Sequence, residues 1–302
     1  MLAILGGFGA ALCWATASLA SARASRLIGS WATLGWVMLI GTLVAAPATL
    51  LWGGGADLSP TALQLLAISG ATNVVGLLLV YTALKSGKVA VIAPIVSTEG
   101  AMGAVISIVF GEQVGIAAAI VLTAIAAGIV LSSLGGGDKP TTVEPGGLTV
   151  ESDTAERAAG PGQPGRRAVL LALGAVVAFG INLYASARIG ATLPIAWSML
   201  PARLGGFLFV ALPLLATGRL HLTRAALPLV VVVALAEVVG TAVYAFGARD
   251  GIAVAAVTSS QFGAIAAVVS VVFFHERLRR IQVAGVVVIA VGVALLAAIQ
   301  SS

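Results

Sequence analysis

The chain has 302 residues, of which 60% are hydrophobic and only 9% are charged, and its mean hydropathy is +1.11. A soluble domain of this length needs far more charge to cover its surface, so the composition excludes a water-soluble protein and predicts an integral membrane protein. The net charge of +5 indicates basic cytoplasmic loops and no nucleic-acid partner, because Lys and Arg gather on the cytoplasmic side of membrane proteins.

Apolar runs bounded by charges, Gly or Pro recur along the chain and predict ten transmembrane helices. Each run is about 20 residues long, which suffices to cross ~30 Å of hydrocarbon. A spanning segment must satisfy its own backbone hydrogen bonds, and the alternating polarity of a membrane barrel is absent, so we expect an all-α membrane protein. The predicted spans are residues 2–22, 31–52, 61–84, 89–110, 114–134, 168–187, 194–217, 225–248, 252–274 and 281–299.

Short sequences recur in the same order in the two halves of the chain, which predicts a duplication. We expect one five-helix repeat at residues 1–134 and a second at residues 168–302. Because five is an odd number, the second repeat enters the membrane in the opposite sense, and the repeats are inverted around a central cavity. The matching segments include Ala20-Ser21-Ala22-Arg23 with Ala185-Ser186-Ala187-Arg188, Trp36-Val37-Met38-Leu39 with Trp197-Ser198-Met199-Leu200, and Asn73-Val74-Val75-Gly76 with Glu237-Val238-Val239-Gly240.

Residues 135–167 separate the repeats and are rich in Gly, Pro and charged side chains, which predicts a disordered linker. Thirteen of the 16 Lys and Arg residues lie in the gaps after odd-numbered spans, whereas Arg188 and Arg249 lie on the other side. The positive-inside rule therefore predicts a multi-pass protein of the cell (inner or plasma) membrane, with the linker in the cytoplasm and both termini outside.

Three charged residues lie inside predicted spans, where each costs about 2.5–3.5 kcal/mol and therefore faces a partner or a wet cavity. They are Glu99 in the fourth span, Arg203 in the seventh and Glu237 in the eighth. Two interpretations remain open. Arg203 pairs with Glu237 or Glu99 and only fixes the packing, or the carboxylates take up a proton or bind a cationic substrate while Arg203 binds an anionic group.

Other polar and aromatic side chains are candidates for the same cavity. Asn73 occupies in the first repeat the position of Glu237 in the second, so the two lie at equivalent depths. Amides add hydrogen-bonding capacity or join helices, and aromatic rings line a cavity or anchor the membrane interface. The remaining candidates are Asn182, Gln261, Trp14, Tyr81, Trp197 and Tyr244.

Two features predict helix breaks and helix ends. Pro94 lies in the fourth span, before Glu99, and a break there would free backbone carbonyls as a gating helix requires. Glu112 and Glu276 stand at matching turns after the fourth and ninth spans, and we expect each to cap the N-terminus of the next helix.

Several short motifs resemble those of the drug/metabolite transporter superfamily, specifically its EamA-type members. They are Trp14, Asn182 after Phe179, the segment Met199-Leu200-Pro201-Ala202-Arg203, and the turns Phe110-Gly111-Glu112 and Phe274-His275-Glu276. The resemblance covers nearly the whole chain except the linker. It implies ten helices around a central cavity and transport of small metabolites, amino acids or drugs, frequently outward.

These features together predict a secondary active transporter of small metabolites, an exporter driven by a proton or substrate gradient through alternating access. We expect a monomer in the lipid bilayer with a small-molecule substrate, no cofactor and no enzymatic activity. The sequence has no P-loop for ATP, and His221 and His275 lie far apart without a neighbouring Cys, so no metal site is expected. The alternatives are a passive channel or facilitator and, less favoured, a membrane-embedded enzyme acting on lipid-linked substrates.

Overall fold

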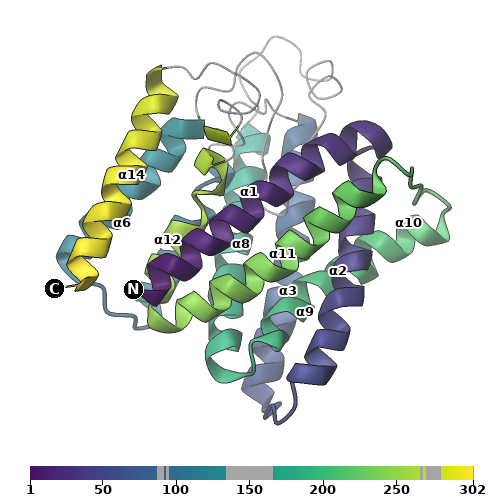
Figure 1. Ribbon diagram of the computed structural model, residues 1–302, viewed down its shortest axis with the longest axis horizontal. Coiled ribbons are helices and arrows are strands. Elements are labelled where there is room, and N and C mark those ends of the chain that lie inside the picture. The colour runs from purple at the N-terminus through teal and green to yellow at the C-terminus, as the bar shows by residue number, and fades with distance from the viewer. Residues whose placement is uncertain (87–91, 93–94, 134–165, 266–267, 270–279, 302) are drawn as a thin grey trace.

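The computed structural model describes residues 1–86, 92, 95–133, 166–265, 268–269 and 280–301 (Figure 1). Pro94, Glu276 and nearly all of the predicted linker lie outside these described residues. Within them all regular secondary structure is helical, in agreement with the predicted all-α membrane protein.

The helices follow the predicted apolar runs. Seven helical segments of the described chain are long and apolar enough to cross a membrane, and three shorter apolar helices lie in the fourth, fifth and ninth predicted spans. The first half contains α1 (Leu2–Ile28), α2 (Ser30–Trp52), α3 (Pro60–Ser86), α5 (Glu99–Val109) and α6 (Ile116–Ser133). The second half contains α8 (Arg166–Thr192), α9 (Ala196–Gly206), η1 (Phe207–Ala211), α10 (Leu212–Ala216), α11 (Leu227–Gly247), η2 (Ala248–Asp250), α12 (Ile252–Ser259) and α14 (Arg280–Ser301).

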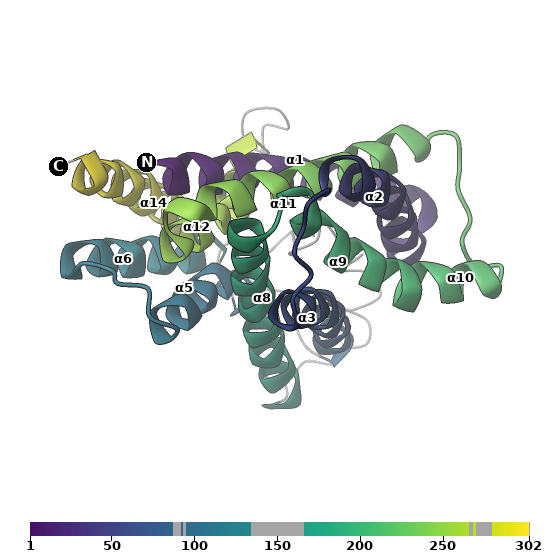
Figure 2. The ribbon, with the colours of Figure 1, turned by 90° about the horizontal axis from the view of Figure 1, so that it is seen from below.

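The most extensive helix contacts join the two halves of the chain. The first helix of each half packs along the third helix of the other, so that α1 lies beside α11 and α3 beside α8. Three further pairs join helices of equal rank, namely α2 with α9, α5 with α12, and α6 with α14. The last pair lies together at one edge of the bundle in both views (Figures 1 and 2). Reciprocal contacts of this kind are expected of two similar units related by a twofold axis.

Small residues allow these helices to approach closely, as is usual where lipid provides no hydrophobic driving force between helices. A Cβ atom on Gly6 of α1 would collide with the backbone of Gly247 in α11. A Cβ atom on Gly285 of α14 would likewise collide with the backbone of Ser132 in α6. Larger residues at these positions would force the two halves apart.

Polar contacts define the two ends of the bundle. At the end that we call the terminus end, the ammonium group of Met1 lies 2.8 Å from the Asp250 carboxylate, and Arg249 Nε donates to the Gly190 carbonyl at 2.7 Å. At the opposite end, Trp36 Nε1 donates to the His221 carbonyl at 3.0 Å. These contacts show which helix ends lie together.

Candidate functional site

A cavity of about 50 Å³ lies at the centre of the bundle, between the two halves. Its wall is formed by α1, α2, α3, α5, α8, α9 and α11 and by Phe262 after α12, whereas α6 and α14 contribute no lining residue. A water molecule requires roughly 10–15 Å³ on this measure, so the cavity holds a few waters, and a metabolite enters only when side chains move. Seven of the predicted site residues line it: Trp14, Asn73, Glu99, Asn182, Arg203, Glu237 and Tyr244.

Corresponding positions of the two halves meet at this cavity. The sequence matches that indicate duplication also relate four pairs of lining residues, one member of each pair in each half. Within every pair one side chain is more polar than the other, so the two sides of the wall differ in chemistry. The pairs are Trp14 with Phe179, Asn73 with Glu237, Leu77 with Thr241, and Glu99 with Phe262.

Arg203 of α9 and Glu237 of α11 form a buried ion pair on one side of the cavity. Arg203 Nη2 lies 2.8 Å from Glu237 Oε2, and the two side chains are 4% and 3% exposed. Arg203 Nη1 contacts the sulfur of Met38 at 3.7 Å. Arg203 Nε and Glu237 Oε1 have no hydrogen-bond partner among the described residues. The pair thus cancels its own charge while leaving one donor and one acceptor without a partner.

Glu99 provides the cavity's other carboxylate, and it lacks an ionic partner among the described residues. The residue is 4% exposed, lines the cavity and occupies the first turn of α5. No hydrogen-bond or ion-pair partner of its side chain is found in the described part of the chain. The positive end of the helix dipole favours a carboxylate at this position. Glu99 is therefore available to a proton or a ligand.

The fourth and ninth spans are both interrupted at the cavity, at corresponding positions. Turns at Ser97–Thr98 and at residues 260–261 directly precede the cavity residues Glu99 and Phe262. Hydroxyl groups satisfy carbonyls near each break, since Thr98 Oγ1 donates to Ile95 at 2.7 Å and Ser260 Oγ donates to Val257 at 3.0 Å. Pro94 lies outside the described residues, and the second interruption occurs in a segment without proline. Paired hydroxyl residues were thus the better sequence signal.

The three amide candidates differ in their surroundings. Asn73 lines the cavity, and its Oδ1 has no partner in the described part of the chain. Asn182 also lines the cavity, and its Oδ1 accepts a hydrogen bond from Ser69 Oγ at 2.8 Å. Gln261 is 2% exposed and its Nε2 has no partner among the residues that the structure describes, but it lies in the interruption and is not part of the cavity wall. Two of the three are therefore positioned for a ligand.

The aromatic candidates separate in the same way. Trp14 and Tyr244 line the cavity, with ring centroids 6.1 Å apart. Trp197 instead donates from Nε1 to the Gly53 carbonyl at 3.0 Å, and Tyr81 stacks on Trp31 with centroids 4.7 Å apart. Neither Trp197 nor Tyr81 is among the lining residues of this cavity, and the contacts of both are packing contacts between helices; a part in substrate binding stays a prediction for them.

Two hydroxyl residues of the cavity wall were not predicted from the sequence. Each lies one helical turn after a residue that was predicted. Ser186 lies one turn after Asn182, and Thr241 lies one turn after Glu237. Residues four apart share a helix face. This four-residue spacing is the sequence signal that could have identified the two residues.

The Glu112 carboxylate caps a different helix from the one predicted. Its two carboxylate oxygens accept hydrogen bonds from the Ala253 amide at 3.2 and 3.0 Å. It therefore caps α12 in the second half and not the next helix, α6. Glu276 lies outside the described residues.

An apolar helix bundle that encloses charged groups and interrupted helices is the architecture of membrane transporters. The EamA-like transporter family matches residues 1–134 and 166–298. The chain belongs to this family and is a multi-pass membrane transporter of the drug/metabolite transporter superfamily.

A solved structure known only as "Crystal structure of protein" is 18% identical to the chain. The match has a TM-score of 0.74 and covers 97% of this chain and 95% of that chain, so it shows the fold. No curated protein matches the sequence.

Proposed function

We propose that the chain is a secondary active transporter of small metabolites in which two inverted repeats, residues 1–134 and 168–302, alternate access to the central cavity. Inversion is supported by the terminus end, where Met1 contacts Asp250 and Arg249 contacts Gly190. The beginning of α1 and the end of α8 meet there, so the first helices of the two halves run in opposite directions. The reciprocal helix pairs support the same relationship.

The observation that carries the proposal is the difference between the two buried carboxylates. Glu237 is neutralised by Arg203, so the protonation of Glu99 decides whether the cavity has a net charge of minus one or zero. An unbalanced charge is costly in a site of low dielectric constant. A proton and the cationic group of a substrate therefore compete for Glu99, and this competition couples their movements.

In the part of the chain that the structure describes, few ionisable groups lie near Glu99. Arg203, Glu237 and Tyr244 share its cavity. The neighbouring helices α6 and α12 contain no Asp, Glu, Lys, Arg or His. The arginines of α8 lie in its first turn or at the exposed Arg188 near its other end. Among the described residues, the ion pair across the cavity is therefore the main charged neighbour of Glu99.

The remaining polar atoms suit a substrate with both donors and acceptors. Within the described structure, Trp14 Nε1 and Arg203 Nε are donors without partners, and Asn73 Oδ1 and Glu237 Oε1 are acceptors without partners. A buried polar atom without a partner costs about 1–3 kcal/mol, and a polar ligand that pairs with it recovers this cost.

We propose outward transport, with the linker in the cytoplasm.

A comparison of metabolites tests this function. Cells that express the protein are compared with cells that lack it, and a compound that increases in the medium is identified. Transport of that compound is then measured in proteoliposomes that contain the purified protein. A secondary transporter accumulates that compound against its gradient when a pH gradient is imposed, and a protonophore abolishes the accumulation. Flux that only equalises concentrations, with or without a pH gradient, would instead establish a passive channel or facilitator.

A further inference from the structure

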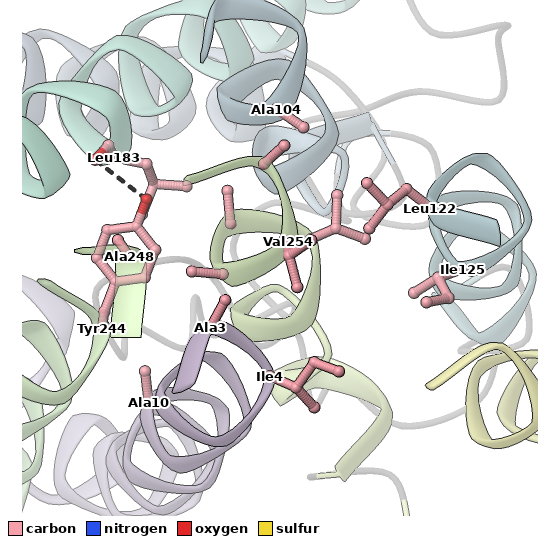
Figure 3. Close-up of a cluster of buried hydrophobic side chains, with 14 of the residues drawn as sticks. Ala3, Ile4, Ala10, Ala104, Leu122, Ile125, Leu183, Tyr244, Ala248 and Val254 are labelled. Carbon is pink, nitrogen blue, oxygen red and sulfur yellow. Dashed lines mark hydrogen bonds between the residues drawn. The ribbon is translucent and has the colours of Figure 1, made fainter. Parts of the chain in front are cut away.

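The cavity is covered toward the terminus end by apolar side chains from both halves. Helices of both halves contribute to this cover, and Figure 3 labels some of its side chains. They include Ala3 of α1, Ala104 of α5, Leu183 of α8, Tyr244 of α11 and Val254 of α12, each no more than 6% exposed. A substrate that leaves at this end must separate these helices.

Tyr244 forms the inner layer of the cover. Its side chain lines the cavity and is fully buried, and its hydroxyl donates to the Leu183 carbonyl of α8 at 3.1 Å (Figure 3). Thr241 lies one turn earlier on α11 and also lines the cavity. Thr241 is therefore reached from the terminus end only after Tyr244 has moved.

Glu112 forms the outer layer, and local backbone geometry explains its position. The amide of Gly111 donates to Ile108 and the amide of Glu112 donates to Ser107, both at 3.0 Å, which is the Schellman pattern that ends a helix. Gly111 has φ of 98°, a conformation that favours glycine. This turn directs the Glu112 carboxylate to the first turn of α12, where both oxygens accept from Ala253.

The contact between Glu112 and Ala253 joins the two halves at the terminus end, where they must separate for the cavity to open. α5 carries Glu99 at one end and is followed by Glu112 at the other, while α12 leads into the interruption before Phe262. A charged acceptor at a helix N-terminus is stronger than a neutral one. By contrast, the Met1–Asp250 pair at the same end is 56% and 44% exposed, and exposed pairs contribute little.

We propose that Glu112 is a gate residue of the transport cycle, whose carboxylate holds α12 against the end of α5 and keeps the cavity closed at the terminus end. This inference rests on the proposed alternating access. Opening at the terminus end then requires the bonds between Glu112 and Ala253 to break, and Tyr244 to leave Leu183. Glu112 acts by positioning α12 and does not touch the substrate.

Thiol accessibility tests the gate in the full-length protein. Cys13 is the only cysteine, so Cys13→Ser provides a background for one reporter, Thr241→Cys. A membrane-impermeant methanethiosulfonate cation is added to each face of oriented membranes in turn. With Glu112→Ala we expect the labelling rate from the terminus face to rise about tenfold, equivalent to ~1.4 kcal/mol. Glu112→Gln, which keeps an acceptor oxygen, should give a smaller rise of about threefold.

Two further variants keep the test decisive. Asp57→Ala removes another acidic side chain from the loop that follows α2, one that is exposed, and should leave the labelling rate unchanged. Tyr244→Phe removes only the bond to Leu183 and should raise the rate about threefold. Parent-like rates in Glu112→Ala, Glu112→Gln and Tyr244→Phe would overturn the gate, as would an equal rise in Asp57→Ala. Accessibility is measured without substrate, so this failure is distinct from an absence of transport.

Discussion

The two sides of the cavity contain equally buried carboxylates in opposite circumstances. On the side formed by α9 and α11, Glu237 is held by Arg203 at 2.8 Å. On the side formed by α5, Glu99 is just as buried but has no ionic partner in the described structure. Burial alone therefore does not identify the working group of such a site. The partner decides whether a carboxylate holds helices together or remains available to a ligand.

The largest loss of stability is expected from Arg203→Ala, which removes the arginine of the buried ion pair. Glu237 would then be a buried charge without compensation, and breaking such a pair costs about 3–5 kcal/mol. Unfolding by detergent titration measures the loss of stability. Arg203→Ala combined with Glu237→Ala should recover part of the loss, because no unpaired charge remains. A double variant that loses the full sum of the two single effects would show that the pair is not energetically coupled.

Glu237→Gln should have the next largest effect. The amide keeps the shape and one oxygen for Arg203 but removes the charge, and a hydrogen bond to a charged group contributes about 1.5–3 kcal/mol. We expect a stability loss of this size in the same titration. Glu99→Gln is the matched control, an identical substitution at an equally buried position, and should lose less stability than Glu237→Gln, because it breaks no ion pair of the described structure. Equal losses in the two variants would remove the distinction between the two sides.

Ser69→Ala should have a smaller effect on the wall formed by α3 and α8. It removes the donor to Asn182 Oδ1, and a neutral hydrogen bond contributes about 0.5–1.5 kcal/mol. Thr123→Ala is the control, since its exposed hydroxyl bonds only to Ala119 in its own helix. Substrate affinity in Ser69→Ala should fall as the Asn182 amide loses its orientation. Unchanged affinity would show that Asn182 does not bind the substrate.

The membrane fold and the charged residues of the cavity could be predicted from the sequence, because apolar length and the cost of intramembrane charge are local properties. The partner of each charge could not. Whether Arg203 reaches Glu237 or Glu99 depends on how α9, α11 and α5 pack. Glu112 binds a residue 141 positions away, which no local capping rule detects. The position of Trp197 could not be predicted because a tryptophan is equally suited to lining a cavity or to fixing a helix end.

The pH dependence of flux in Glu99→Gln, with Glu237→Gln as its comparison, tests the central claim most directly. Both variants are reconstituted, and the flux of the identified metabolite is measured across imposed pH gradients. We predict that Glu99→Gln abolishes the response to the gradient in a protein as stable as the parent, whereas Glu237→Gln is less stable but still responds. A parent-like response in Glu99→Gln would contradict the assignment of Glu99 as the coupling carboxylate.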